Sequence, residues 1–330
     1  MRVAVLTGRV GSGADPDDQD TLDQAAAVVC ALEALGHEAW LVGPDLDLLD
    51  ALRAVRAYAP GAVFNLAETV DGRDDLAHAA ADLLAVQGIP CTGSDGRALL
   101  LSNDKPLCKR QLAAAGVPTP PFVEPEGDDR ALVCGDFAPG EYIVKPSRVH
   151  ASKGIDADSV VRCASANEAA HAARRAALRH GRPCFAERYV AGREFAVSLL
   201  AGAPGCEPQV MPLAEMLFTG DWQRPILTYA AKWDQDCREY ADSVRSFGSA
   251  PEDEPLAQAM RRAALGSWRV LGLAGYARVD FRVGEAGEPF VIDVTANPCL
   301  APDAGFIAAC AQAGIGYEEI VGRILAAACP

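Results

Sequence analysis

Three short stretches constrain the fold of this chain most, and they come in a fixed order: residues 142–155, 277–281 and 292–298. The first places Lys145 at the end of an apolar strand, followed by proline and a loop of small residues. The other two are apolar strands that each carry a carboxylate. A strand lysine, a small-residue loop and two late acidic strands suit ATP and magnesium. The trio therefore predicts a reaction type as well as a fold, the activation of a carboxylate by phosphoryl transfer.

Length and charge set the outer limits. At 330 residues the chain is long enough for two or three packed subdomains, since single domains usually hold about 100 to 150 residues. Its formal net charge of -15 repels a polyphosphate backbone, so we expect no nucleic-acid partner. The N-terminus lacks the apolar core of a signal peptide, and no run reaches the roughly 18 to 20 apolar residues of a membrane span. We expect a cytoplasmic protein with no membrane partner.

The eleven cysteines are scattered and include no Cys-x-x-Cys pair. Several lie in Ala- and Val-rich segments, where a thiol behaves as a small buried hydrophobe. We expect reduced structural thiols for most of them. Cys299 is the exception, because it stands next to Pro298 at the end of the third stretch.

Strands and helices alternate over a first predicted domain, residues 1–95, and this implies a parallel sheet. Thr21-Leu-Asp-Gln24 is typical of a capping box that opens a helix, which Gly36 ends. Residues 89–94 are expected to be an extended exit from this domain. The expected strands are 2–7, 39–42 and 62–66, and the expected helices are 21–35 and about 76–86.

Strands dominate the two further predicted domains, 96–190 and 191–330. The expected helices are 106–115, 167–178 and 318–327, and the expected strands are 141–145, 159–162, 184–190, 194–201, 276–283 and 289–294. A turn at 284–289 joins the two late strands.

Lys145 is the first candidate for phosphate binding. A lysine at a strand end places a point charge beside backbone N–H groups that can converge on phosphate oxygens, here in the loop that holds Ser152, Lys153 and Gly154. A surface lysine before a flexible turn explains this segment alone equally well. The extra cation of Lys153 favours an anionic ligand, and Lys105, at a helix start, offers another lysine.

Glu187 and Glu194 stand on either side of a glycine-containing turn. Each carboxylate could accept hydrogen bonds from a nucleotide, one from an adenine amino group and one from ribose hydroxyls. Tyr189 and the backbone of Val190, at a hinge between sheets, would lie beside the base. A charged hairpin surface is the alternative, and without the other motifs it would be preferred.

Asp280 and Asp293 each lie within a late strand, where an unpaired buried carboxylate would cost several kcal/mol. Two such acids on neighbouring strands need a cation. Mg²⁺ is the natural one, since it prefers oxygen ligands and commonly bridges carboxylates to ATP phosphates. An ion pair with Arg278 is the alternative for one acid, but it cannot easily cover both.

Taken together, these residues resemble the ATP-grasp superfamily, and within it the D-alanine:D-alanine ligase branch. The resemblance implies an α/β (α+β) ATP-grasp fold, in which an N-terminal parallel-sheet domain precedes two ATP-binding subdomains. The likeness covers nearly the whole chain, through segments 63–68, 88–94, 104–105, 116–120, 145–154, 187–194, 229–233, 278–280 and 297–298.

The resemblance also implies roles around the nucleotide. In that family the residues matching Lys105 and Lys145 hold the ATP phosphates, and the match to Lys232 faces them too. Those matching Glu187 and Glu194 bind adenine and ribose.

Metal and catalytic roles follow from the same resemblance. Asp280 and Asp293 match the two metal carboxylates, for two Mg²⁺ ions that Mn²⁺ could replace. Arg278 matches the arginine that stabilises the oxyanion of the tetrahedral intermediate, with Lys232 as the second catalytic residue. The family's Glu-x-Asn motif reads Asp293-Val-Thr295 here, so Thr295, or Asn297 two residues on, would complete the metal site.

Other departures from the family fall in the substrate pocket. Residues 11–18 lack the family's glutamate and serine pattern near the first strand. Ala151 and Trp233 stand where the family has the serine and tyrosine of its lid, and Cys299 replaces a glycine. The residues that match the family's ATP-binding positions are mostly unchanged.

We therefore expect an ATP-dependent carboxylate–amine ligase that works through an acyl phosphate and releases ADP and phosphate, and that is not a cell-wall D-alanine–D-alanine ligase. Its small-molecule carboxylate and amine would belong to an amino acid or amino-acid-like metabolite of secondary metabolism, and an intramolecular reaction would close a ring. Two alternatives stay open, a nucleotide-binding protein with weak or lost catalysis and an ATP-dependent small-molecule kinase. Related ligases are often dimers, so a homodimer is expected.

Overall fold

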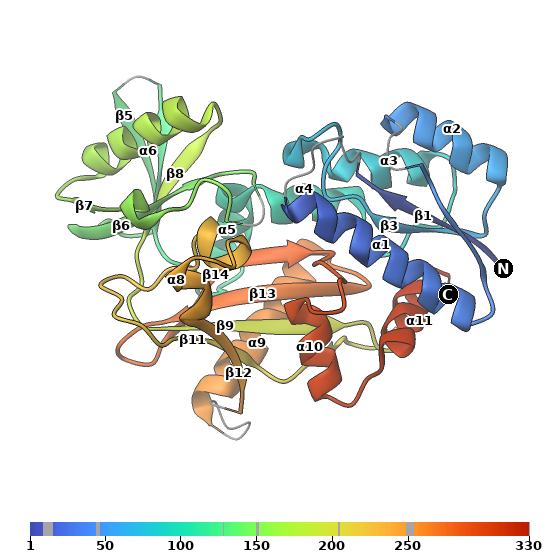
Figure 1. Ribbon diagram of the computed structural model, residues 1–330. Coiled ribbons are helices and arrows are strands. Elements are labelled where there is room, and N and C mark those ends of the chain that lie inside the picture. Colours follow the sequence, from blue (N-terminus) through green and yellow to red (C-terminus); the bar gives the residue numbers. More distant parts are fainter. Residues whose placement is uncertain are drawn as a thin grey trace.

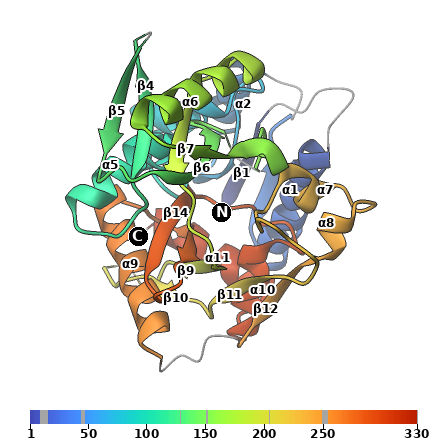
Figure 2. The same ribbon diagram turned by 90° about the vertical axis from the view of Figure 1, so that its left-hand side faces the viewer.

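Three sheets build the protein, as a computed structural model shows (Figure 1). The structure describes residues 1–8, 16–43, 47–127, 129–149, 152–203, 205–248 and 254–329. Within these ranges, the second sheet stands over the third, and the first sheet lies to one side of both (Figures 1 and 2).

The first sheet is parallel, as predicted, with strand order β2-β1-β3. Its elements are β1 (Arg2–Thr7), α1 (Pro16–Ala34), β2 (Glu38–Leu41), α2 (Leu48–Tyr58), β3 (Ala62–Leu66), a 3₁₀ turn (Asp74–Leu76) and α3 (His78–Val86). The predicted extended exit, residues 89–94, runs beside β3, where Cys91 forms an isolated parallel bridge with Val63.

The predicted start of the first helix at Thr21 is wrong. α1 begins at Pro16, so Thr21 lies more than one turn inside the helix. Proline starts a helix well, because its φ is already helical and it has no N–H that would need a partner. Gln24, the predicted partner in the capping box, instead accepts a hydrogen bond from Leu300 N at 3.1 Å.

The second sheet is antiparallel, with strand order β5-β4-β8-β6-β7. It contains β4 (Phe122–Glu126), β5 (Arg130–Cys134), β6 (Gly140–Pro146), a 3₁₀ turn (Ala157–Ser159), β7 (Val160–Cys163), α6 (Ala166–His180) and β8 (Cys184–Arg188). β4 and β5 are not among the predicted strands. β5 lies at the edge of the sheet, where most of its side chains are exposed and no inside-outside alternation develops.

The third sheet is antiparallel, with strand order β12-β11-β9-β13-β14 and β10 paired to β9. It contains β9 (Arg193–Leu200), β10 (Gln209–Val210), β11 (Ala214–Phe218), β12 (Ser243–Phe247), β13 (Tyr276–Val283) and β14 (Pro289–Ala296). The helices around it are α4 (Gly96–Asn103), α5 (Lys105–Ala114), α7 (Tyr229–Trp233), α8 (Arg238–Ala241), α9 (Pro255–Leu271), α10 (Gly305–Gln312) and α11 (Tyr317–Ala328).

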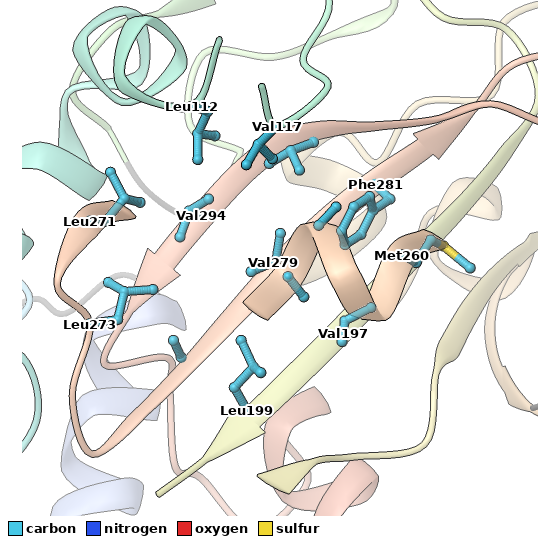
Figure 3. Packing of buried hydrophobic residues seen from close by; sticks show 14 of the residues in the cluster. Leu112, Val117, Val197, Leu199, Met260, Leu271, Leu273, Val279, Phe281 and Val294 are labelled. Atoms are coloured by element: carbon cyan, nitrogen blue, oxygen red, sulfur yellow. The ribbon is translucent and has the colours of Figure 1, made fainter. Parts of the chain in front are cut away.

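Alternation along β13 and β14 separates the core from the other face of the third sheet. Val279, Phe281 and Val294 are buried against Met260 of α9 in the largest hydrophobic cluster (Figure 3). Because side chains alternate along a strand, the residues between them face the opposite side. Arg278 and Asp280 therefore share a face that this core does not fill.

The three sheets follow the predicted segments in order, but packing joins them across the predicted boundaries. Ala98, Leu99 and Leu112, from α4 and α5, belong to the core of the third sheet. α11 packs beside α1, in a second core that joins the first sheet to the end of the chain (Figure 1). The domain division at residues 95 and 190 stays a prediction. Within the described ranges, every helix is too short or too polar to cross a membrane.

Met260→Ala is expected to lower the free energy of unfolding by about 2–5 kcal/mol, because it empties a fully buried site under the third sheet. Gln258→Ala, on the exposed face of the same helix, should stay within about 0.5 kcal/mol of wild type. Denaturant unfolding measures both. Equal effects of the two substitutions would contradict this account of the core.

Candidate functional site

A cavity of about 1470 Å³ opens where the three sheets meet. It collects almost every candidate residue of the sequence analysis, from segments far apart in the chain. Those that line it are Lys105, Lys145, Ser152, Lys153, Glu187, Tyr189, Val190, Glu194, Lys232, Arg278, Asp280, Asp293, Thr295 and Asn297. Gly154 does not line the cavity. Its φ of +78° favours glycine, and a Cβ there would lie only 3.0 Å from Cγ of Pro146. Ala151 and residues 11–15 lie outside the described ranges.

Lysine is confined to this region of the molecule. The chain has five lysines among its 30 basic residues, and four of them, at 105, 145, 153 and 232, line the cavity. The fifth, Lys109, contacts Glu187. Ammonium groups thus gather at one cavity, whereas arginine supplies the rest of the basic surface. Such a group of compact point charges suits a polyanionic ligand.

Lys105 is the first residue of α5, whose N-cap is Asp104. The Asp104 side chain accepts from Leu107 N at 3.0 Å and pairs with Arg148 at 2.8 Å, which fixes the helix start beside the loop after β6. Nζ of Lys105 donates to the Val149 carbonyl at 2.9 Å and lies 3.5 Å from Oδ1 of Asp293. The helix thus aims a buried lysine between the loop and an acid of the third sheet.

Glu187 lies between two lysines in the floor of the cavity. Its Oε1 is 2.7 Å from Nζ of Lys145, and its Oε2 pairs with Nζ of Lys109. All three side chains are buried. Burial alone would raise the pKa of Glu187, but the two ammonium groups hold that pKa below its usual value. The carboxylate is therefore an anion inside the protein.

Glu194, Tyr189 and Arg282 form the adjoining wall. Oε2 of Glu194 is 3.0 Å from Nη2 of Arg282, whose guanidinium lies over the Tyr189 ring at 5.7 Å from its centroid. Val190 lies in the link between β8 and β9, where the chain passes from the second sheet to the third. These residues place an aromatic ring, a carboxylate and a backbone segment at the end of the cavity nearest that link.

Asp280 and Asp293 are directly opposite each other on β13 and β14. Like charges in such a pair repel, so the arrangement needs cations. In the structure Arg278 donates two hydrogen bonds to Asp280, from Nε to Oδ1 at 2.7 Å and from Nη2 to Oδ2 at 2.8 Å. The ion pair considered as an alternative for one acid is thus present. Lys105 is a nearby cation for Asp293.

The same two strands test which oxygens could hold a metal. Thr295 is the cross-strand partner of Arg278 and lies on the face of Asp293. Oδ1 of Asn297 instead accepts a hydrogen bond from Ser94 N at 2.9 Å. Asn297 therefore also joins the third sheet to the exit from the first. The metal set of Asp280 and Asp293, completed by Thr295 or Asn297, stays a prediction.

Among the described residues no group of three or more His, Cys, Asp or Glu side chains could hold a metal alone. Two opposed carboxylates nevertheless fit Mg²⁺, which commonly binds one or two carboxylates and completes its shell with phosphate oxygens and water. The donor set thus fits a metal that arrives with a nucleotide.

The wall of the cavity also includes residues that the sequence reasoning missed. Asp20 of α1, Glu68 after β3 and Arg245 of β12 all line it. Glu68 could have been found, because ligands commonly bind beyond the carboxyl ends of parallel strands. Asp20 and Arg245 belong to no motif, and only the fold brings them here.

Cys299 also lines the cavity, and its Sγ lies 3.0 Å from Oδ2 of Asp20. Burial, together with the charges of Glu68 and Asp20, raises the pKa of the thiol strongly. The group is therefore a neutral donor to a carboxylate and not a nucleophile. All eleven cysteines are unpaired in the structure.

A family model, curated relatives and solved structures all match this chain to D-alanine–D-alanine ligases. A model of the D-ala D-ala ligase C-terminus matches residues 138–326. D-alanine–D-alanine ligase of Methylococcus capsulatus is 30% identical over 98% of this chain and 94% of its own length. The ligase of Halorhodospira halophila is 32% identical over 98% and 95%. The crystal structure of the Bacillus anthracis ligase complexed with ATP superposes with a TM-score of 0.73 at 19% identity, covering 100% of this chain and 97% of that one.

Lys232→Met is expected to raise the melting temperature of the ligand-free protein at pH 7. Burial in the cavity wall, and next the charge of Arg278, lower the pKa of Lys232 below that of an ordinary lysine. The unfolded chain therefore binds more protons between the two pKa values, and holding the charged form costs stability at lower pH. Each kcal/mol relieved corresponds to roughly 2 °C.

The pH dependence gives the check. The gain over wild type should shrink as the pH rises toward about 10.4, where an unfolded lysine loses its proton. Arg238→Met, on the exposed neighbouring helix α8, should leave the melting temperature near wild type. A lower melting temperature for Lys232→Met at pH 7 would contradict the prediction.

Proposed function

Because this chain belongs to the D-alanine–D-alanine ligase family of ATP-grasp carbon–nitrogen ligases, we propose that it joins a carboxylate to an amine through an acyl phosphate formed from ATP. The observation that carries the proposal is the gathering of Lys105, Lys145, Lys232 and Arg278 in one cavity with two opposed carboxylates. That set offers cations for a triphosphate and acids for its metal, in a fold shared with an ATP-bound relative.

The nucleotide end would use the second sheet and its link to the third. Glu187 would accept a hydrogen bond from the adenine 6-amino group, and Glu194 would accept from the ribose hydroxyls. Lys105 and Lys145 would hold the phosphates, with the loop that holds Ser152 and Lys153 over them. Mg²⁺ bound by Asp280, Asp293 and Thr295 would neutralise charge on the transferred phosphoryl group.

In the first step a substrate carboxylate oxygen attacks the γ-phosphorus, and the bond to the β–γ bridging oxygen breaks, which releases ADP. In the second step the amine lone pair attacks the acyl carbon of the acyl phosphate. The tetrahedral intermediate then expels phosphate, which can carry away the amine proton. Lys105, Lys145 and Lys232 would offset the negative charge of the first step.

Arg278 would serve the second step. Asp280 holds the guanidinium through Nε and Nη2, which fixes its plane beside the metal acids. Nη1 is then available in a pre-set direction for the oxyanion of the tetrahedral intermediate. A fixed donor at such a position typically lowers the barrier by about 3–4 kcal/mol.

The substrate end supports a molecule other than two D-alanines. The family's lid serine and tyrosine are replaced by Ala151 and Trp233, and Cys299 stands in place of a glycine. Asp20 and Arg245 add an acid and a base to the wall. We propose an amino acid or amino-acid-like metabolite of secondary metabolism, joined to an amine or closed on itself in a ring.

Lys145→Ala is expected to abolish the rise in melting temperature that ATP with Mg²⁺ produces in wild type. The substitution removes the ammonium group that would bind the ATP phosphates and that pairs with Glu187 in the ligand-free protein. Arg162→Ala, exposed on the neighbouring strand β7, is the matched control and should keep the full rise. An unchanged response in Lys145→Ala would remove this residue from the nucleotide site.

Asp293→Asn is expected to raise the Mg²⁺ concentration needed for half-maximal ADP release by at least roughly tenfold, since even supporting partners of metal ligands have effects of that size. Glu285→Gln, in the turn of the same hairpin, should not change it. ADP release is measured with a panel of carboxylates and amines.

The products separate the candidate functions. A ligase releases ADP and phosphate only when both a carboxylate and an amine are present. A small-molecule kinase gives a stable phosphorylated product without the amine, and a nucleotide-binding protein shows the thermal response alone. AMP as product, or no turnover with any pair in the panel, would refute the ligase proposal.

A further inference from the structure

Lys109 is a buried charge that the proposed mechanism does not use. Its exposed fraction is 2%, and it lies on α5, one turn after Lys105. Glu187 and Lys145 both line the cavity, but Lys109 contacts Glu187 from behind, within the protein. It is also the one lysine of the five that does not line the cavity.

The contacts of Lys109 tie three parts of the chain together. Besides the ion pair with Oε2 of Glu187, Nζ donates to Oγ1 of Thr119 at 2.8 Å and to the Val291 carbonyl at 3.3 Å. Thr119 itself donates to the same carbonyl at 2.9 Å. The ammonium is thus held by a helix, a linker and β14, and its position does not depend on Glu187 alone.

Lys109 and Lys145 both pair with the Glu187 carboxylate, and only Lys145 has a further role in the proposed mechanism. Lys145 pairs with Glu187 in the ligand-free protein, at 2.7 Å. When Lys145 turns to a phosphate, Glu187 would be left as a buried carboxylate without a partner, which is costly. Lys109 avoids that cost, because its ion pair with Oε2 of Glu187 would remain when Lys145 moves to the phosphate.

We propose that Lys109 is a positioning residue for nucleotide recognition: it holds Glu187 as an anion aimed at the adenine 6-amino group and leaves Lys145 free for the phosphates. This inference rests on the proposed function. A fixed carboxylate accepts from a 6-amino group and repels the 6-oxo group of guanine. Lys109 would therefore determine the preference for ATP over GTP without touching either nucleotide.

The test compares dissociation constants for ATP and GTP, each with Mg²⁺ and without a carboxylate, so that no turnover is needed. Lys109→Met leaves Glu187 to pair with Lys145 or to take up a proton, and either change removes its preference for an N–H donor. ATP binding should weaken roughly tenfold or more, and the GTP-to-ATP ratio of dissociation constants should fall by a similar factor, as expected for one charged hydrogen bond. Lys109→Arg should restore most of the preference.

Thr119→Val is the matched control. It removes the hydroxyl that Lys109 contacts but leaves the ion pair with Glu187, so it should keep the wild-type base preference. A wild-type ratio in Lys109→Met would overturn the inference. An equal loss in Thr119→Val would overturn it as well, because the effect would then come from general loosening.

Glu187→Gln provides the second background if Lys109→Met does not fold. The neutral amide needs no counter-ion, so adding Lys109→Met to it should cause no further loss of ATP preference. A further loss in the double variant would overturn the inference. Absence of any ATP binding by wild type would refute the proposed function itself, whereas normal ATP preference in both wild type and Lys109→Met refutes only the role of Lys109.

Discussion

The register between β13 and β14 is the constraint on which the site depends. Asp280 faces Asp293, and Arg278 faces Thr295, while Val279 and Val294 face each other on the opposite side. One set of backbone hydrogen bonds thus fixes both the two opposed carboxylates and the hydrophobic core on the other face of the sheet. A slip by one residue would exchange the two faces, burying the charges and exposing the apolar side chains. The core under α9 therefore secures the position of the carboxylates.

A second constraint joins the sheets. Each sheet contributes only part of the cavity, and polar side chains hold the parts in register. Lys109 reaches from α5 to β8 and β14, and Asn297 reaches from the end of β14 to Ser94. Asn297 has a φ of 52°, a strained value for a residue other than glycine, which the contact with Ser94 helps to hold. Strain at such a junction is consistent with a site assembled from separate units.

Local patterns singled out residues that the fold brings into one cavity, although they missed or misplaced some of the elements around it. The roles of these residues stay predictions. Lys145 stood out because it ends an apolar strand before a loop of small residues, and Asp280 because a charge within an apolar strand is expensive. Both arguments need only neighbours in sequence. The helix start was misplaced at Thr21 because the capping-box pattern was followed and the proline upstream, at which α1 begins, was not considered. β5 was missed because its exposed edge position leaves no alternation of buried and exposed side chains. Lys109 carries no local signal at all. Its partners, Thr119, Glu187 and Val291, come together only in the folded chain.

The confinement of lysine has a consequence for the covalent chemistry of the protein. Primary amines are the side chains that acylating reagents and reactive acyl metabolites attack, and guanidinium groups resist them because they stay protonated. Apart from the N-terminus, the amines of this chain lie in one cavity or directly behind it. Acylation of a side-chain amine would thus fall on the groups that line this cavity or support its floor. The outer surface, basic only through arginine, offers such reagents no lysine to absorb them.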